Sequence, residues 1–131
     1  LAWQKYQEAI QADDDYANAH FILGRLYARQ RLETKAREEL QRAIELDERD
    51  TYPRNCLAHL ELVTGDYATA ITMFRQVLED DPAEEYALLH LGEALWAAER
   101  KDEAREPLEK LCKNGSQPEL VSKARRLLDE M

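Results

Sequence analysis

A period of 34 residues, held over three consecutive blocks without an insertion, constrains this chain more than any other feature of its sequence. The blocks are residues 17–50, 51–84 and 85–118. A unit of this length cannot bury an apolar face by itself, so repeated units must stack on their neighbours. Position 8 of each block is small, position 20 is alanine and position 24 is large and apolar: Gly24, Ala58 and Gly92; Ala36, Ala70 and Ala104; Leu40, Phe74 and Leu108.

Each block contains two apolar helical patterns separated by a turn. Apolar residues recur at three- and four-residue steps, and the pattern is interrupted near positions 14 to 17, where the middle block reads Thr64-Gly65-Asp66. Acidic residues or proline follow the second pattern, as at Asp81-Pro82, and suit the end of one helix and the start of the next. Each block is therefore predicted to form a helical hairpin, and residues 1–16 match the second half of the same unit.

Composition supports a helical protein and excludes several functions. Apolar residues make up 44% of the chain and charged residues 34%, with only four glycines and four prolines, which is typical of an ordered all-α domain. The net charge of −9 argues against a nucleic-acid partner. No apolar run approaches the roughly 18 residues of a membrane span, so we expect no direct membrane insertion. The sequence begins with Leu1, and localisation stays open between the cytoplasm and, after removal of a leader, the periplasm.

The order of small and large residues, with Asp-Pro near the end of a block, resembles the tetratricopeptide repeat (TPR) family. The resemblance implies an all-α fold in which helical hairpins stack into a right-handed α-α superhelix. We expect a single array over residues 1–131: a half repeat at 1–16, the three full repeats, and a C-terminal capping helix at 118–131 that is apolar on one side only. Because the half repeat lacks its first helix, we expect the chain to continue a longer array.

Signals for catalysis or metal binding are weak. His20 falls on the core side of its helix, whereas Cys56, His59 and His90 fall on outward faces where they could meet, but without an evident fourth ligand. Cys56 and Cys112 occupy apolar helical positions and are predicted to be buried. No glycine-rich phosphate loop and no nucleophile paired with a base occurs. We therefore expect no enzymatic activity, no cofactor and no bound metal.

The outward positions of the first helices are the candidate binding site. At 100° per residue, positions 2, 5, 9, 12 and 13 point away from the hairpin core, and here they are unusually apolar. The resemblance places the first helices on the concave side of the superhelix, so these residues would meet in one groove suited to peptides. The expected groove residues are Asn18, Phe21, Arg25, Arg29, Tyr52, Asn55, His59, Tyr86, Leu89, His90, Glu93 and Trp96.

The function expected from this pattern is a non-catalytic scaffold that binds a peptide or protein segment in the groove. Tyr52 and Tyr86, both at position 2, are the expected anchors, and Arg25 and Arg29 make one end of the groove basic. The lysines with which some TPR proteins clamp a chaperone C-terminus are absent. Two alternatives remain: self-association through the N-terminal half repeat, and a recruiting domain of a larger enzyme or assembly.

Overall fold

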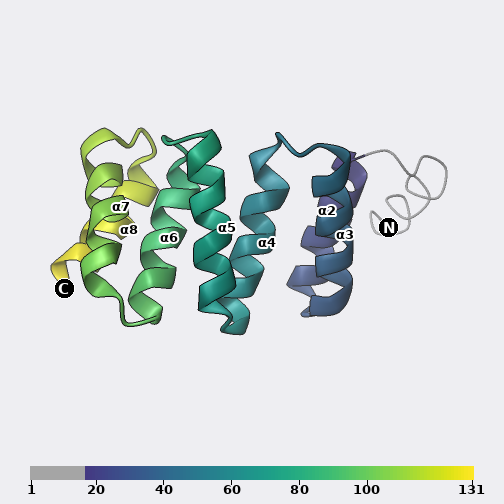
Figure 1. Ribbon diagram of the computed structural model, residues 1–131, viewed down its shortest axis with the longest axis horizontal. Helices are drawn as coiled ribbons and strands as arrows, with labels where there is room; N and C mark the ends of the chain where they lie inside the picture. Colours follow the sequence, from purple (N-terminus) through teal and green to yellow (C-terminus); the bar gives the residue numbers. More distant parts are fainter. Residues whose placement is uncertain (1–16) are drawn as a thin grey trace. The chain divides into compact units, whose positions relative to one another are not determined.

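The computed structural model describes residues 17–131, which form helices joined by short turns (Figure 1). The half repeat predicted at residues 1–16 lies outside the described residues. Within the described part no strand occurs, as the sequence predicts. The helices are α2 (Ala17–Arg29), α3 (Glu33–Leu46), α4 (Thr51–Thr64), α5 (Tyr67–Asp80), α6 (Glu85–Ala97), α7 (Lys101–Asn114) and α8 (Pro118–Asp129).

The chain divides into two compact units, and the boundary lies inside α4, between Leu60 and Glu61. The N-terminal unit contains the α2–α3 hairpin and the first part of α4. The C-terminal unit contains the end of α4 and helices α5 to α8.

In the N-terminal unit, α2 and α3 pack side by side around a core of small and branched side chains. Leu23 and Leu40 are buried, and Ala36 of α3 is completely covered. The two helices approach so closely that a Cβ atom on Gly24 would lie 2.8 Å from Leu40 Cγ and 3.3 Å from the Leu40 backbone nitrogen. Gly24 is therefore favoured by the close packing of this hairpin.

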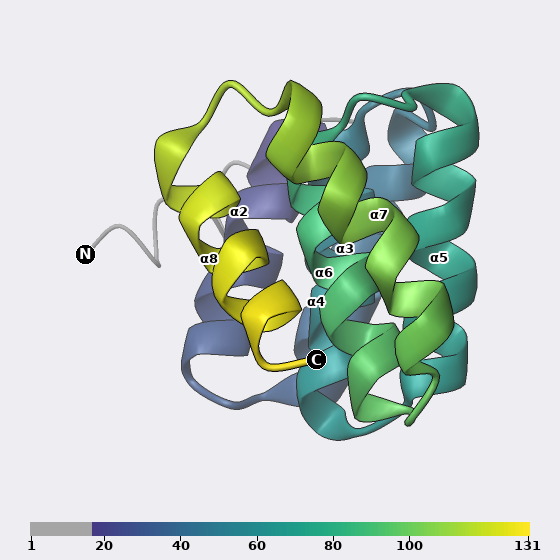
Figure 2. The same cartoon turned by 90° about the vertical axis from the view of Figure 1, so that its left-hand side faces the viewer.

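The C-terminal unit has the same close approach between the two helices of a hairpin, and α8 packs against this hairpin. A Cβ atom on Gly92 of α6 would lie 2.5 Å from Leu108 Cγ of α7. The helix predicted at residues 118–131 is present as α8, which packs against both α6 and α7 (Figure 2). Its apolar side completes the core cluster of this unit, which comprises Leu88, Leu89, Leu108, Leu111, Leu120 and Ala124.

A carboxylate fastens the loop before α8 to the start of α6. Glu85 accepts hydrogen bonds from the Ser116 backbone N–H (2.8 Å), the Ser116 hydroxyl (2.7 Å) and the Gln117 backbone N–H (3.0 Å). The Ser116 hydroxyl and then the Gln117 N–H lower the pKa of Glu85 below its ordinary value of 4.5, because they favour the ionised form. We call this set of bonds the Glu85 latch.

The turn inside each hairpin has the same backbone conformation at position 15. Arg31 and Glu99 have φ of 61°, and Gly65 has φ of 95°. In each turn the N–H of the next residue donates to a carbonyl five residues back, as in Leu32 to Tyr27 (2.9 Å), Asp66 to Glu61 (2.9 Å) and Arg100 to Leu95 (2.8 Å). This left-handed residue with its long hydrogen bond is the Schellman ending of a helix. Only the middle repeat has glycine there.

Candidate functional site

The predicted groove residues differ widely in exposure. Tyr52 is 63% exposed and Tyr86 43%, so both expected anchors reach the surface. Asn18, Arg25, Arg29 and His59 are also exposed, whereas Phe21, His90, Glu93 and Trp96 are half-buried. Two residues are buried, Asn55 at 8% and Leu89 at 1% exposure.

Leu89 was expected on the open face of α6, but it is buried. It lies in the core cluster together with Leu120 and Ala124 of α8. The reason is that α8 packs against α6 as well as α7, so it covers part of α6 that would be open in an internal repeat. The expected exposure of Leu89 was wrong, because a period defines the faces of one helix but not the element that covers each face.

In the N-terminal unit, Phe21, Arg25 and Tyr52 form a continuous surface, which we call the N-terminal patch. The Phe21 and Tyr52 ring centroids lie 6.5 Å apart with the planes tilted by 30°, a favourable separation for an aromatic pair. The Arg25 guanidinium carbon lies 5.6 Å from the Phe21 centroid, within cation–π distance. Asp50 bounds the patch and accepts the Tyr52 backbone N–H (3.0 Å).

Two further polar side chains of α4, Asn55 and Cys56, follow Tyr52 by about one helical turn. The Asn55 oxygen Oδ1 is buried and has no hydrogen-bond donor among the described residues. Cys56 is half-buried, and burial raises the pKa of its thiol; the positive charge of Arg25 opposes this rise and the negative charge of Asp50 adds to it. Both cysteines were predicted to be buried, but Cys112 is also only half-buried.

In the C-terminal unit, Tyr86, His90 and Glu93 of α6 form a second surface, the C-terminal patch. The Tyr86 ring stacks on His90, with centroids 6.3 Å apart and planes at 24°. His90 also contacts the buried ring of Phe74 at 5.8 Å, and its Nδ1 lies 3.2 Å from Glu93 Oε1. The sequence indicated Phe74 only as a core residue. Its contact with a surface histidine depends on how α5 packs against α6, which no single position reveals.

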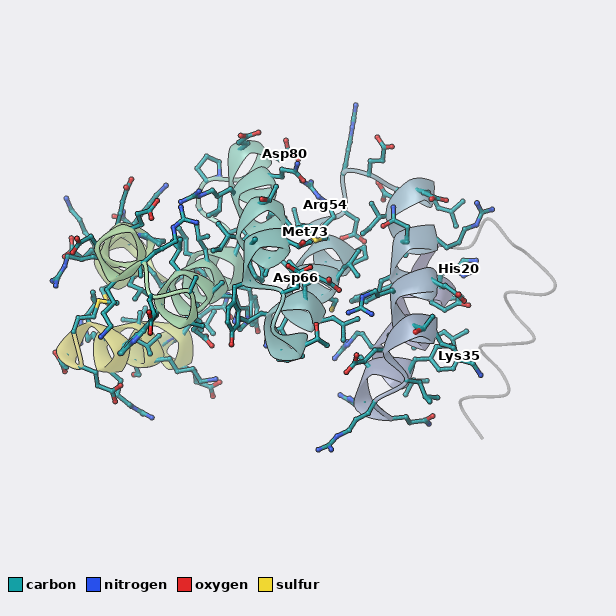
Figure 3. All side chains as sticks on the ribbon, turned by 60° about the horizontal axis from the view of Figure 1, so that its bottom comes forward. His20, Lys35, Arg54, Asp66, Met73 and Asp80 are labelled. Atoms are coloured by element: carbon teal, nitrogen blue, oxygen red, sulfur yellow. The ribbon has the colours of Figure 1, made fainter. Side chains whose placement is uncertain are left out.

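His20 lies on the core side of α2, as predicted, and is 3% exposed. Its Nδ1 lies 2.6 Å from Glu39 Oε2 of α3; Figure 3 labels His20 among the side chains of this hairpin. Among residues 17–131, no group of three or more His, Cys, Asp and Glu side chains is arranged to hold a metal ion. None of the helices in that range is long and apolar enough to cross a membrane.

Comparison with protein families decides the fold family. A family model described as tetratricopeptide repeat matches residues 2–53 and 57–117, which is most of the chain. The chain belongs to the tetratricopeptide repeat family. The sequence prediction of the TPR family is thereby confirmed.

Solved structures resemble this TPR chain in fold. A crystal structure of MamA is 19% identical, with a TM-score of 0.76 over 98% of this chain and 85% of that chain. A second MamA structure is 21% identical, with a TM-score of 0.74 over 98% of this chain and 63% of that one. The type III secretion translocator chaperone SycD of Yersinia enterocolitica, in its alternative dimer, is 20% identical, with a TM-score of 0.80 over 88% of this chain and 91% of that chain. A search of curated proteins finds no significant match.

Proposed function

We propose that this TPR chain is a non-catalytic protein-interaction module that binds a peptide or protein segment on the outward faces of its first helices. The observation that carries the proposal is the pair of exposed tyrosines. Tyr52 and Tyr86 are exposed, yet each ring is held against a second ring, Phe21 or His90. Rings held in this way offer a large contact area at little entropic cost, as aromatic anchors of binding surfaces do.

The family and its structural neighbours support a protein partner. TPR units stack into extended surfaces, and repeat proteins of this kind use such surfaces for binding. One structural neighbour, SycD, is a translocator chaperone whose structure is a dimer. For the present chain, the mixture of aromatic, polar and charged side chains in each patch suits a peptide, because apolar anchors are accompanied by hydrogen-bonding groups.

The experiment selects ligands directly and then removes the anchors. A library of displayed random peptides is selected on the immobilised chain, and the enriched peptides are synthesised and titrated by fluorescence anisotropy. We expect Tyr52→Ala or Tyr86→Ala to weaken binding of the peptides that contact that patch by about 1 to 4 kcal/mol, which is roughly fivefold to several hundredfold in affinity. Circular dichroism shows whether each variant keeps its helices and melting temperature.

Tyr67→Ala is the matched control, because Tyr67 is a partly exposed tyrosine at the start of a second helix, outside both patches. It should leave the affinity within about twofold. The proposal is contradicted if the Tyr52→Ala/Tyr86→Ala double variant is folded and binds every selected peptide with the affinity of the original chain. Self-association then becomes the leading alternative, and sedimentation should reveal a mass that rises with concentration. The half repeat proposed for that contact lies outside the described residues.

A further inference from the structure

The negative charge of this protein is concentrated in its C-terminal unit. The N-terminal unit, residues 1–60, contains nine Lys and Arg against eleven Asp and Glu, a net charge of −2, and its described part, residues 17–60, has a net charge of +1. Residues 61–131 contain nine Lys and Arg against sixteen Asp and Glu, a net charge of −7. The N-terminal unit is therefore the part of the described chain on which an acidic ligand meets the least repulsion.

Two arginines in that unit have no ionic partner among the described residues. Among residues 17–131, neither Arg25 nor Arg29 has an ion pair, although both are exposed in a protein rich in carboxylates. They lie four residues apart on α2, which places their Cα atoms about 6 Å apart along the helix axis. Arg25 stacks on Phe21, and stacking leaves the N–H edge of a guanidinium able to donate two parallel hydrogen bonds to a carboxylate.

Asn55 adds a requirement for a hydrogen-bond donor. It lies one turn after Tyr52 on α4, and its buried Oδ1 has no donor among the described residues. Leaving a buried acceptor unpaired costs stability, which a ligand N–H would recover. The main-chain N–H groups inside a helical ligand are already bonded within the helix, whereas those of an extended segment are open to a partner. Because the oxygen is covered, neighbouring side chains must move as the bond forms.

We propose that the N-terminal unit binds an extended acidic segment of a partner protein, which makes the proposed function specific and rests on it. Carboxylates on alternate residues of the segment, about 6.6 Å apart, match the spacing of Arg25 and Arg29. An apolar side chain of the segment lies on Phe21 and Tyr52, and a main-chain N–H donates to Asn55. The carboxylate of Asp50, which caps α4, repels further carboxylates of the segment and so limits the length of its acidic stretch at that end.

The test uses defined peptides and the full chain. One fluorescein-labelled peptide has Glu at alternate positions around a central Phe; a second has the same composition with adjacent glutamates; a third has Lys in place of Glu. We expect the first to bind most tightly and to lose affinity with added salt, because exposed charge pairs are screened. Arg25→Gln/Arg29→Gln should weaken it about tenfold.

Arg125→Gln/Arg126→Gln is the control for total charge, because it removes two exposed arginines from α8 and should change the affinity less than about twofold. Asn55→Leu tests the conformation of the ligand. We expect it to weaken the first peptide several-fold while the melting temperature stays the same or rises, a combination that a purely structural role for Asn55 would not give.

Different failures have different meanings. Equal binding by the Arg25→Gln/Arg29→Gln variant overturns the acidic ligand, and unchanged affinity in Asn55→Leu overturns the extended conformation. If the Lys peptide binds best and its affinity still depends on Tyr52, the proposed function stands and the inference of an acidic segment fails. If neither defined nor library-selected peptides bind, both fail.

Discussion

Position 15 of the hairpin turns holds two residues in a conformation that suits glycine. Arg31 and Glu99 adopt φ of 61°, where a side chain costs about 1 kcal/mol relative to glycine. We predict that Glu99→Gly raises the free energy of unfolding by about 0.5 to 1 kcal/mol. Gly65→Ala should lower it by about 1 kcal/mol, through the backbone alone, because no atom lies within 4 Å of a Cβ placed there. Urea unfolding measures both changes.

Glu99→Ala separates the backbone effect from the loss of a charge. It removes the carboxylate but keeps a Cβ atom, so it should not produce the gain expected for glycine. Equal stabilisation by Glu99→Ala and Glu99→Gly would show that the charge, and not the left-handed backbone, is responsible.

At the scale of single residues, the sequence predicts the conformation or exposure of some side chains and misses that of others, for identifiable reasons. Thr64-Gly65-Asp66 indicates a turn because glycine favours positive φ. Arg31 and Glu99 give no such signal, because the Schellman hydrogen bonds compensate for their strain. Tyr52 and Tyr86 were predicted to be exposed and are, whereas Asn55 and Leu89 are buried, and the burial of Leu89 depends on α8.

At the scale of elements, the Glu85 latch holds the α7–α8 loop at the start of α6 and so helps to position α8. We predict that Glu85→Gln destabilises the C-terminal unit at neutral pH. Because the pKa of Glu85 is lowered in the folded chain, its contribution is fully present above pH 4.5 and is lost as the pH falls through the lowered pKa. The difference in unfolding free energy between the original chain and Glu85→Gln should shrink over that range, as measured by urea unfolding from pH 7 to 3.

Glu119→Gln is a suitable control for the latch, because Glu119 is an exposed carboxylate in the first turn of α8. Its effect on the free energy of unfolding at neutral pH should be small. A difference for Glu85→Gln that stays constant down to pH 3 would show that the ionised carboxylate does not stabilise the loop.

At the scale of the whole molecule, the two compact units should respond separately to damage in their cores. Gly92→Ala forces a Cβ atom into Leu108, which is completely buried, and should cost about 1 to 3 kcal/mol. We predict that backbone amides in residues 61–131 lose protection from hydrogen exchange while those in 17–60 keep theirs. Gly24→Ala, which meets Leu40, should give the opposite pattern. Uniform loss over both ranges in either variant would indicate one cooperative unit.

The unit boundary could not be predicted from the period. Small residues at position 8 and large ones at position 24 predict the hairpins, because a close helix approach needs both, as Gly24 with Leu40 and Gly92 with Leu108 demonstrate. A strict period makes all repeats alike, whereas the division inside α4 reflects the density of contacts around it. The single array over residues 1–131 stays a prediction.

The half-buried thiol of Cys56 provides a chemical probe of the N-terminal patch. Its raised pKa leaves little thiolate at neutral pH, so alkylation by iodoacetamide should be slow and should accelerate as the solution becomes alkaline. Because Arg25 acts on this thiol electrostatically, a carboxylate that neutralises Arg25 removes the influence that favours thiolate, and a bound segment also hinders the reagent. The alkylation rate of Cys56, with that of Cys112 as the internal standard, thus reports occupancy of the patch without any label on the ligand.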